Sequence, residues 1–279
     1  IGRLPVKTVA EAQNAVNKIK HYYDTRSFGA WRNWMALVGD DEDSNIHMRD
    51  ANRLATHVDT MNPEYNIDKI FFDAYPQVST SGGQRYPGVA DAINSRMDKG
   101  ALVVSYVGHG GELGWAHERV LEISQINNWT NYDRMPLFVT ATCEFSRYDD
   151  PQRTSAGELV FLNPSGGGIG LLTTTRLVYS TPNFQLANQF FQRALEPMDA
   201  EGNMPIDPVI TLASSDKISP NILEVTMTSN WRGFKTICMA ALSTYKYSVS
   251  TSGKSTATSL KVARHKRLDS STLALSTKV

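Results

Sequence analysis

Apolar and amphipathic stretches alternate along the first 195 residues of the chain. The apolar stretches are short and continuous, which is typical of β-strands buried on both faces. The stretches between them repeat apolar residues at helical spacing, which predicts helices. The pattern therefore predicts an α/β fold with a mainly parallel sheet covered on both sides. The expected strands cover 34–39, 68–75, 101–108, 136–143 and 167–175, and the expected helices cover 8–24, 47–61, 86–100, 156–163 and 181–195.

This pattern is lost beyond about residue 200. Ser and Thr crowd the last 37 residues, and residues 243–279 carry seven Lys or Arg against one acid. Low hydrophobicity without periodicity does not favour a packed core. We therefore expect a folded domain over 1–200, a divergent connecting segment over 201–242, and a basic, poorly ordered tail over 243–279.

The charge balance limits the classes of partner. The chain has 28 Lys or Arg and 28 Asp or Glu, so the residues before 243 hold 27 acids against 21 basic residues. Excess negative charge repels nucleic acid, and we expect no nucleic-acid partner unless the tail alone recruits one. No apolar run is long enough to span a membrane, and the first residues lack an initiator Met and a signal-peptide profile. We expect a soluble domain from within a longer protein.

Reactive side chains follow the predicted strands where each one ends. Asp40 and Asp41 follow the first strand, His109 follows the third, Cys143 ends the fourth, and Thr173–Thr175 end the fifth. Ligands bind at the carboxyl ends of the strands in an open α/β sheet, so we expect these side chains to gather at one edge. A thiol, a base and an orienting acid are the components of nucleophilic cysteine catalysis.

Each of these residues also has an ordinary structural interpretation. Most free cysteines are buried and inert, so Cys143 alone does not establish a nucleophile. His109 lies among glycines with no apolar surface to pack against, which favours a role toward a ligand, and His117 is the rival base. The four acids at 40–43 are equally compatible with a turn or a calcium-binding loop.

Other chemistries lack the spacing that they require. A cysteine phosphatase needs Arg six positions after its cysteine to hold phosphate, and Asp149 stands there instead. The Gly-x-Ser-x-Gly motif of serine hydrolases is absent from the sequence. His109 and His117 have no third ligand in register, which disfavours a catalytic zinc ion.

Four long motifs resemble those of the gingipain-type cysteine peptidases, and among them the PorU-type sortases of the type IX secretion system. The resemblance covers about residues 1–200. It implies a caspase-like three-layer α/β sandwich with a His–Cys dyad at His109 and Cys143, and a third, acidic member at Asp40 or the neighbouring Asp41. The motifs are IGRLPVKTVAEAQNAVNKIKHYYD, YVGHGGELGWAHERVLEISQIN, PLFVTATCEFSRYDDPQRTSAGELVFLNP and GLLTTTRLVYS.

Further roles are expected around the dyad. Backbone N–H groups near Gly110 and Cys143 are expected to hold the oxyanion of the reaction. Trp115 and Tyr148 are candidate walls of the substrate pocket. Arginine-specific gingipains have an acid near the position of Asn45, and Asn45 therefore predicts that Arg specificity is lost.

The resemblance implies a cysteine peptidase or transpeptidase that requires no cofactor, with calcium as a candidate ligand. Through a Cys thioester it would cleave a C-terminal signal from secreted protein cargo and attach the cargo to surface lipopolysaccharide. Its partners would include outer-membrane secretion components, and its location would be the outer-membrane surface or the extracellular space. An ordinary secreted endopeptidase of the same fold and a non-catalytic surface binding module are the alternatives.

The tail departs from the family. Members continue into a Leu-Gly-Asp-Pro-Ala segment and then a β-sandwich, but this chain has WRGFKTICMAALSTYKYSV at that place. The overlapping stretch KYSVSTSGKSTATS still resembles the family. We expect a divergent join or a reading-frame change between about 205 and 245, followed by an irregular tail or the start of a β-sandwich.

Overall fold

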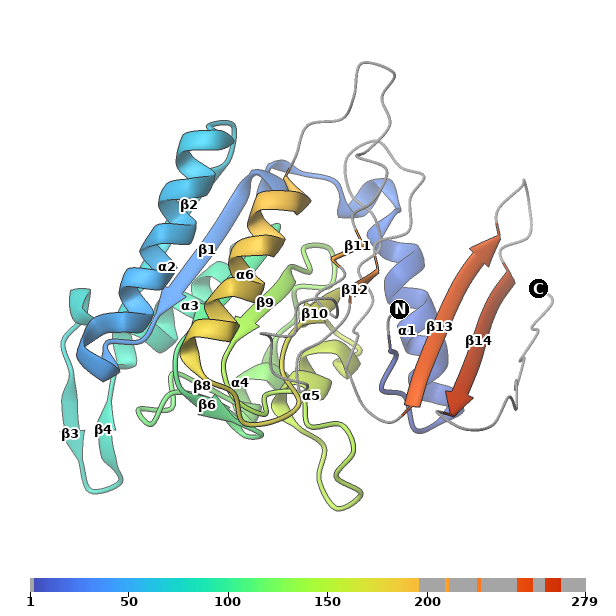
Figure 1. Ribbon diagram of the computed structural model, residues 1–279. Helices are drawn as coiled ribbons and strands as arrows, with labels where there is room; N and C mark the ends of the chain where they lie inside the picture. The colour runs from blue at the N-terminus through green and yellow to red at the C-terminus, as the bar shows by residue number, and fades with distance from the viewer. Residues whose placement is uncertain (1–2, 196–208, 211–224, 227–244, 253–258, 267–279) are drawn as a thin grey trace.

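A five-stranded parallel sheet forms the centre of the molecule in the computed structural model (Figure 1). The structure describes residues 3–195, 209–210, 225–226, 245–252 and 259–266. Every neighbouring pair in the sheet is parallel, which confirms the predicted α/β class. In spatial order the strands are β10 (Gly170–Leu172), β9 (Leu137–Ala141), β5 (Val103–Val107), β1 (Trp34–Gly39) and β2 (Asn66–Phe71).

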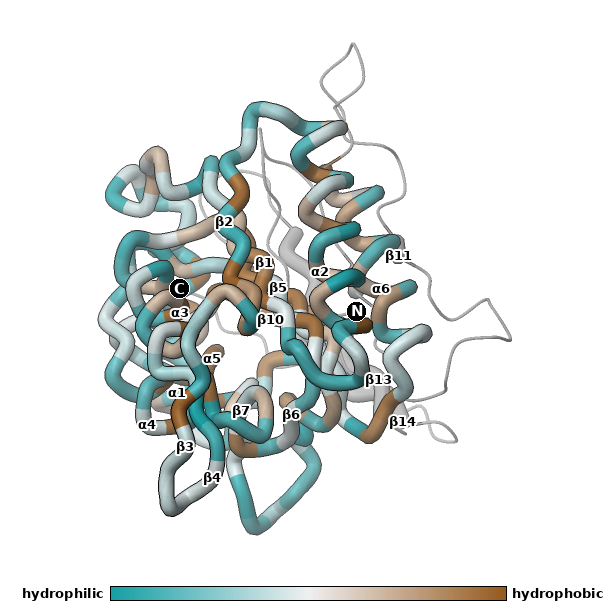
Figure 2. The backbone as a smooth tube through the Cα atoms, turned by 90° about the vertical axis from the view of Figure 1, so that its left-hand side faces the viewer, coloured by the Kyte–Doolittle hydropathy of each residue, from teal (hydrophilic) through white to brown (hydrophobic). Residues whose placement is uncertain are grey.

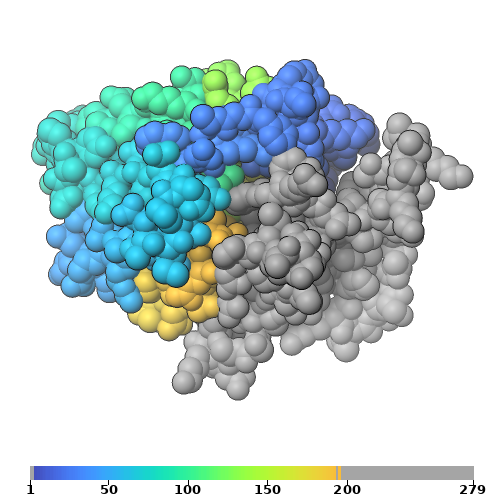
Figure 3. Space-filling view, turned by 90° about the horizontal axis from the view of Figure 1, so that it is seen from above, coloured from blue at the N-terminus to red at the C-terminus, as the bar shows by residue number. Residues whose placement is uncertain are grey.

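Helices cover both faces of this sheet and complete three layers. One face packs against α2 (Glu42–Met61) and α6 (Ser180–Ala194), which adjoin in light blue and yellow in the view of Figure 3. The other face packs against four helices. They are α1 (Val9–Tyr22), α3 (Pro87–Lys99), α4 (Ile123–Asn128) and α5 (Ala156–Leu162).

Successive side chains of each strand enter opposite layers. In β1, Met35 and Leu37 pack with α2 and α6, whereas Ala36 and Val38 pack on the other side, and all four have no exposed surface. Both faces are therefore apolar, and for this reason the sequence shows continuous apolar runs at the strands. Figure 2 shows the hydrophobic colour concentrated in these central strands.

Local signals set several helix ends. Thr8 accepts a hydrogen bond from the backbone N–H of Glu11, and the Glu11 carboxylate accepts one from the N–H of Thr8, which forms a capping box at α1. A proline opens α3, and Gly100 ends it with a φ of 84°. Among the described residues, no helix is long and apolar enough to cross a membrane.

Several small elements were not predicted from the sequence. A hairpin of β3 (Val78–Thr80) and β4 (Gly83–Arg85) projects from the body in Figure 1. Between β5 and α4, three two-residue strands form a small antiparallel sheet, β6 (Gly110–Gly111), β7 (Gly114–Trp115) and β8 (Leu121–Glu122). The expected strand 68–75 ends at Phe71, because η3 (Phe72–Ala74) follows it, and two further short turns are η1 (Thr25–Ser27) and η2 (Ala30–Asn33).

The structure also describes short strands in the C-terminal part of the chain. β13 (Tyr245–Ser252) and β14 (Ser259–Lys266) form an antiparallel pair, and β11 (Val209–Ile210) pairs with β12 (Val225–Thr226). The first pair lies in the segment for which the sequence predicted an irregular tail or the start of a β-sandwich. Most of the predicted connecting segment, with the join expected between about 205 and 245, lies outside the described residues.

Candidate active site

The order of the strands places a crevice at the ends of β1 and β5. The chain leaves β1 toward β2 on one side and later reaches β9 and β10 on the other, so the order of strands reverses between β1 and β5. In open α/β sheets, ligands bind at such a switch point, outside the carboxyl ends of the strands. His109 follows β5 at this place, and Asp40 follows β1.

His109 and Cys143 lie at the same level on neighbouring strands. Val107 at the end of β5 pairs with Ala141 at the end of β9, and each reactive residue stands two positions beyond its member of this pair. The backbone N–H of Gly108 still donates to the carbonyl of Ala141, at 3.3 Å. The sheet register therefore brings the backbones of His109 and Cys143 to the same level of the sheet edge, and their action as a dyad stays a prediction.

The thiol of Cys143 is partly exposed rather than sealed in the core. Its Sγ lies 3.6 Å from the carbonyl oxygen of Val178. The next residue, Glu144, has a φ of 49°, in the left-handed region that non-glycine residues rarely adopt. This sharp turn ends the strand direction directly after the thiol and leaves Cys143 at the surface of the sheet edge.

Asp40 contacts the backbone of His109 and not its ring. One carboxylate oxygen, Oδ2, accepts a hydrogen bond from the His109 N–H at 2.8 Å, and the other accepts one from the Glu42 N–H at 3.0 Å. The Asp40 side chain is fully buried. Tyr106 donates its hydroxyl to the His109 carbonyl at 2.6 Å and so holds the backbone of the same residue. Asp40 is thus placed to position the loop, which differs from its expected role beside the imidazole.

Asp40 lies at this position because a buried carboxylate needs hydrogen-bond donors. Two backbone donors satisfy its charge at the strand end, and Gly108 gives it room, since a Cβ on Gly108 would lie 2.4 Å from the Cβ of Asp40. Asp41, the neighbouring choice, is engaged elsewhere, because Tyr86 donates its hydroxyl to Asp41 at 2.6 Å.

Asp43 is the acid at the imidazole of His109. Its Oδ2 lies 3.0 Å from Nε2 of His109, and Oε2 of Glu42 lies 3.6 Å from the same nitrogen. The hydrogen bond to His109 lowers the pKa of Asp43 below its usual value, so this carboxyl remains charged. The sequence places Asp43 in the same acidic run as Asp40, but the run itself does not reveal which acid reaches the ring.

A strained turn brings Asp43 to the imidazole of His109. Asp43, Ser44 and Asn45 have φ angles of 51°, 58° and 62°, which is a left-handed turn of three non-glycine residues at the start of α2. Each such residue costs about 1–2 kcal/mol relative to the right-handed form. Among the described residues, the other non-glycine residues with positive φ are Ala116, Arg119 and Glu144, which lie in the loops after His109 and Cys143. Strain of this kind persists where a site requires it.

A cleft of about 630 Å³ opens beside His109. Its lining is residues 109–117 with Arg119, Leu121, Glu122, Glu144 and Arg153. Glu112 forms ion pairs across it with Arg147 at 2.6 Å and with Arg153 at 3.1 Å. The rival base His117 stands at this cleft, where its ring nitrogen lies 3.0 Å from Glu42, and this hydrogen bond raises the pKa of His117.

The three other residues expected to bind substrate differ in position. Trp115 borders the cleft, but its side chain has no exposed surface and stacks on Tyr106 with ring centroids 4.4 Å apart. Tyr148 is also buried, with the guanidinium of Arg3 3.6 Å above its ring. Trp115 thus borders the cleft while its ring packs in the core, and Tyr148 is not among the residues that line the cleft. Asn45 is exposed in the strained turn.

Threonines at the end of β10 hydrogen-bond to the residues that precede Cys143. Thr173, Thr174 and Thr175 are all buried. Thr174 donates its hydroxyl to the carbonyl of Thr142, the residue before Cys143, and Thr140 donates to Thr173 at 2.6 Å. The hydroxyls of Thr173 and Thr174 thus bond to the segment that leads to Cys143, and none of the three threonines lines the cleft.

Solved structures with similar folds include a cysteine proteinase. The crystal structure of the Arg-specific cysteine proteinase gingipain R matches with a TM-score of 0.60 and 14% identity, over 95% of this chain and 61% of that one. A complex of the pro- and mature domains of RgpB from Porphyromonas gingivalis matches with a TM-score of 0.58 and 14% identity, over 70% and 45% of the two chains. A third structure, described only as a protease, has 18% identity and a TM-score of 0.51 over 66% of this chain and 38% of that one.

The chain thus spans between 38% and 61% of the length of these structures. None of the curated proteins compared with it matches. The model of one family does match, over residues 1–238, which include every element of the three-layer body and both members of the expected dyad. The chain belongs to peptidase family C25.

Proposed function

We propose that this chain is the catalytic domain of a cysteine peptidase that uses His109 and Cys143 as its dyad. The observation that carries the proposal is the register of β5 and β9, which sets both residues two positions beyond the pair Val107 and Ala141. The partly exposed thiol and the adjacent cleft add to it. Proximity of a thiol and an imidazole at a strand edge is the arrangement that nucleophilic catalysis needs.

The reaction follows from these groups. With Nε2 of His109 held by the carboxylate of Asp43, the proton of the neutral ring sits on Nε2, and Nδ1 takes the proton from the Cys143 thiol. The thiolate sulfur attacks the carbonyl carbon of a peptide and the carbonyl oxygen becomes an oxyanion. Backbone N–H groups near Gly110 and Cys143 would stabilise it. The intermediate collapses as the imidazolium protonates the leaving amine, and a thioester on Cys143 remains.

The second nucleophile decides the reaction class. Water returns the free enzyme by hydrolysis, whereas an amine on a surface lipopolysaccharide would give transpeptidation of the cargo. We favour the sortase reaction because the motifs around His109 and Cys143 resemble the PorU-type sortases over their full length. The chain would then act on secreted protein cargo at the outer-membrane surface or in the extracellular space, beside outer-membrane secretion components.

The cleft supports a broad rather than an Arg-directed specificity. Asn45 carries no charge, and each of the three acids that line the cleft has an arginine nearby: Glu112 pairs with Arg147 and Arg153, Glu122 lies 3.8 Å from Arg119, and Glu144 lies 3.7 Å from Arg147. A basic substrate side chain would have to displace these pairs. No cofactor is required by the proposed chemistry.

Competition between water and an amine separates the proposed sortase from an ordinary endopeptidase. We expect a library of labelled peptides to be cleaved by the full chain and a thioester adduct to appear at Cys143 by mass spectrometry. Added glycinamide should be incorporated into the acyl product and should raise the ratio of transfer to hydrolysis as its concentration rises. Cleavage without incorporation identifies an endopeptidase. Absence of cleavage and of adduct, with intact folding, would support the non-catalytic binding module.

Alanine at Gly110 should damage turnover more than alanine at Gly111. A Cβ on Gly110 would lie 2.6 Å from Oγ1 of Thr142 and 2.9 Å from the carbonyl of Gly114, whereas a Cβ on Gly111 meets nothing within 4 Å. The first change pushes the His109 loop away from the Cys143 segment. A shift of about 1 Å costs about 10²-fold in rate. Steady-state kinetics of the two variants, with thermal unfolding as a check of folding, measure the difference, and equal effects would contradict this account.

A further inference from the structure

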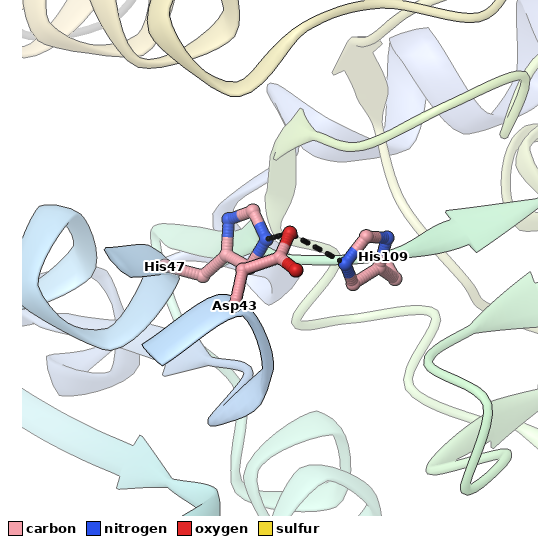
Figure 4. Close-up of side chains that lie close together, drawn as sticks. All are labelled: Asp43, His47 and His109. Atoms are coloured by element: carbon pink, nitrogen blue, oxygen red, sulfur yellow. Dashed lines mark hydrogen bonds and ion pairs between the residues drawn. The ribbon is translucent and has the colours of Figure 1, made fainter. Parts of the chain in front are cut away.

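We propose that Asp43, His47 and His109 form a binding site for Zn²⁺. Figure 4 shows the carboxylate of Asp43 between the two imidazole rings, with His47 one turn along α2 and His109 on the loop after β5. Oδ2 of Asp43 lies 3.0 Å from Nε2 of His109 and 3.4 Å from Nε2 of His47. The three ligand atoms all lie within 4.8 Å of one another.

His47 provides the independent evidence for a ligand. Its side chain is only 7% exposed, and Nε2 is buried without a hydrogen-bond partner. The distance of 3.4 Å between Nε2 and Oδ2 of Asp43 is longer than that of an ordinary N–H···O hydrogen bond. A buried polar atom without a partner costs about 1–3 kcal/mol. A cation held between His47, Asp43 and His109 would supply the partner that this nitrogen lacks.

The donor set favours zinc over calcium. Two imidazole nitrogens and one carboxylate oxygen are typical zinc ligands, whereas calcium takes six to eight oxygens. Zinc bonds of about 2.0–2.2 Å in a tetrahedron place neighbouring ligand atoms about 3.3–3.6 Å apart. The 3.4 Å separation between Asp43 and His47 already meets this spacing, and the 3.0 Å separation between Asp43 and His109 requires only a small opening. Water or Glu42, whose Oε2 lies 3.6 Å from Nε2 of His109, would fill the fourth position.

Zinc at this site would hold the peptidase inactive, a consequence that rests on the proposed function. A histidine binds zinc through a nitrogen lone pair, so coordination by Nε2 of His109 places the ring proton on Nδ1. Nδ1 then has no lone pair with which to accept the thiol proton of Cys143. Metal binding and base catalysis therefore exclude each other at the same ring, and removal of zinc activates the enzyme.

Direct zinc binding tests the site without peptidase activity. The full chain with Cys143→Ala is titrated with Zn²⁺ by calorimetry, and with Co²⁺ to record the visible absorption of a tetrahedral complex. We expect one ion per chain, and we expect His47→Gln and Asp43→Ala each to weaken binding at least about 10-fold. His57→Gln, on the same helix but outside the cluster, is the matched control and should bind as tightly as its parent.

Two results would overturn the site. One is the absence of stoichiometric zinc binding by the folded chain, and the other is binding that neither His47→Gln nor Asp43→Ala weakens. Asp43 is 61% exposed, so Asp43→Ala should fold and can test the site even if His47→Gln does not fold. Inhibition of peptidase activity by zinc is then measured with Cys143 present. His47→Gln should need at least about 10-fold more zinc than the parent chain for the same inhibition. Binding that depends on His47, in a chain without peptidase activity, would retain the site and reject the proposed function.

Discussion

Cys143→Ala is expected to abolish turnover, and His109→Ala to lower kcat/KM by about 10³-fold. The alanine at 143 has no nucleophile, so no thioester forms. Without His109 the thiol keeps its proton and the leaving amine receives none. The double variant should be little worse than Cys143→Ala, because the two residues act as a unit. Cys143→Ser should be nearly as inactive as Cys143→Ala, since a serine hydroxyl ionises far less readily than a thiol.

The rate of iodoacetamide labelling measures this unit directly. Cys238 lies outside the described residues, and Cys238→Ala should leave activity unchanged, so labelling in that background reports Cys143 alone. We expect rapid labelling of the folded protein near neutral pH that becomes slower when His109→Ala is added. If Cys143 reacts only after the protein unfolds, it is a buried structural residue and the proposed peptidase chemistry is wrong.

The sheet could be predicted because its signal is repeated along the sequence. Each central strand sends side chains into two apolar layers, as Met35 and Ala36 do in β1, so continuous apolar runs identify strands and their ends. Once the ends are known, the parallel order brings His109 and Cys143 to one edge. The small sheet of β6, β7 and β8 has strands of two residues, which are too short for any periodicity to show.

The contacts within the site depend on geometry that the residue types alone do not encode. Asp40 and Asp43 stand in one acidic run, yet Asp40 points into the sheet edge and Asp43 reaches the ring through a left-handed turn that no glycine signals. His47 was not singled out from the sequence, because the expected helix began at His47 and Asp43 reaches it through the left-handed turn rather than through helical spacing. Trp115 was expected as a pocket wall and does border the cleft, but its ring stacks in the core on Tyr106.

Asp43→Asn and Asp40→Asn are expected to damage the protein in different ways. Asp43 is 61% exposed and contacts the imidazole, so its replacement should lower kcat/KM by about 10²-fold with little change in thermal unfolding. Without this charge the imidazolium form is less stabilised, and because the proposed reaction starts from neutral His109, the acidic limb of the pH–rate profile should move to lower pH. The shift should be smaller in Glu42→Gln if Asp43 is the orienting acid, because Glu42 lies farther from Nε2, at 3.6 Å, and also hydrogen-bonds to His117.

Asp40→Asn should instead lower stability. The buried carboxylate accepts backbone N–H groups from His109 and Glu42 on its two oxygens, and an amide has only one acceptor oxygen for them. The donor left facing the amide nitrogen costs about 1–3 kcal/mol, which a denaturant titration would detect as a lower midpoint. At temperatures where Asp40→Asn remains folded, the variant should show the same pH–rate profile as the parent. The reason is that the contact between Asp43 and the imidazole of His109 is intact. A shifted profile in Asp40→Asn together with an unshifted one in Asp43→Asn would assign the orienting role to Asp40, and would mean that the ring turns toward β1 when substrate binds.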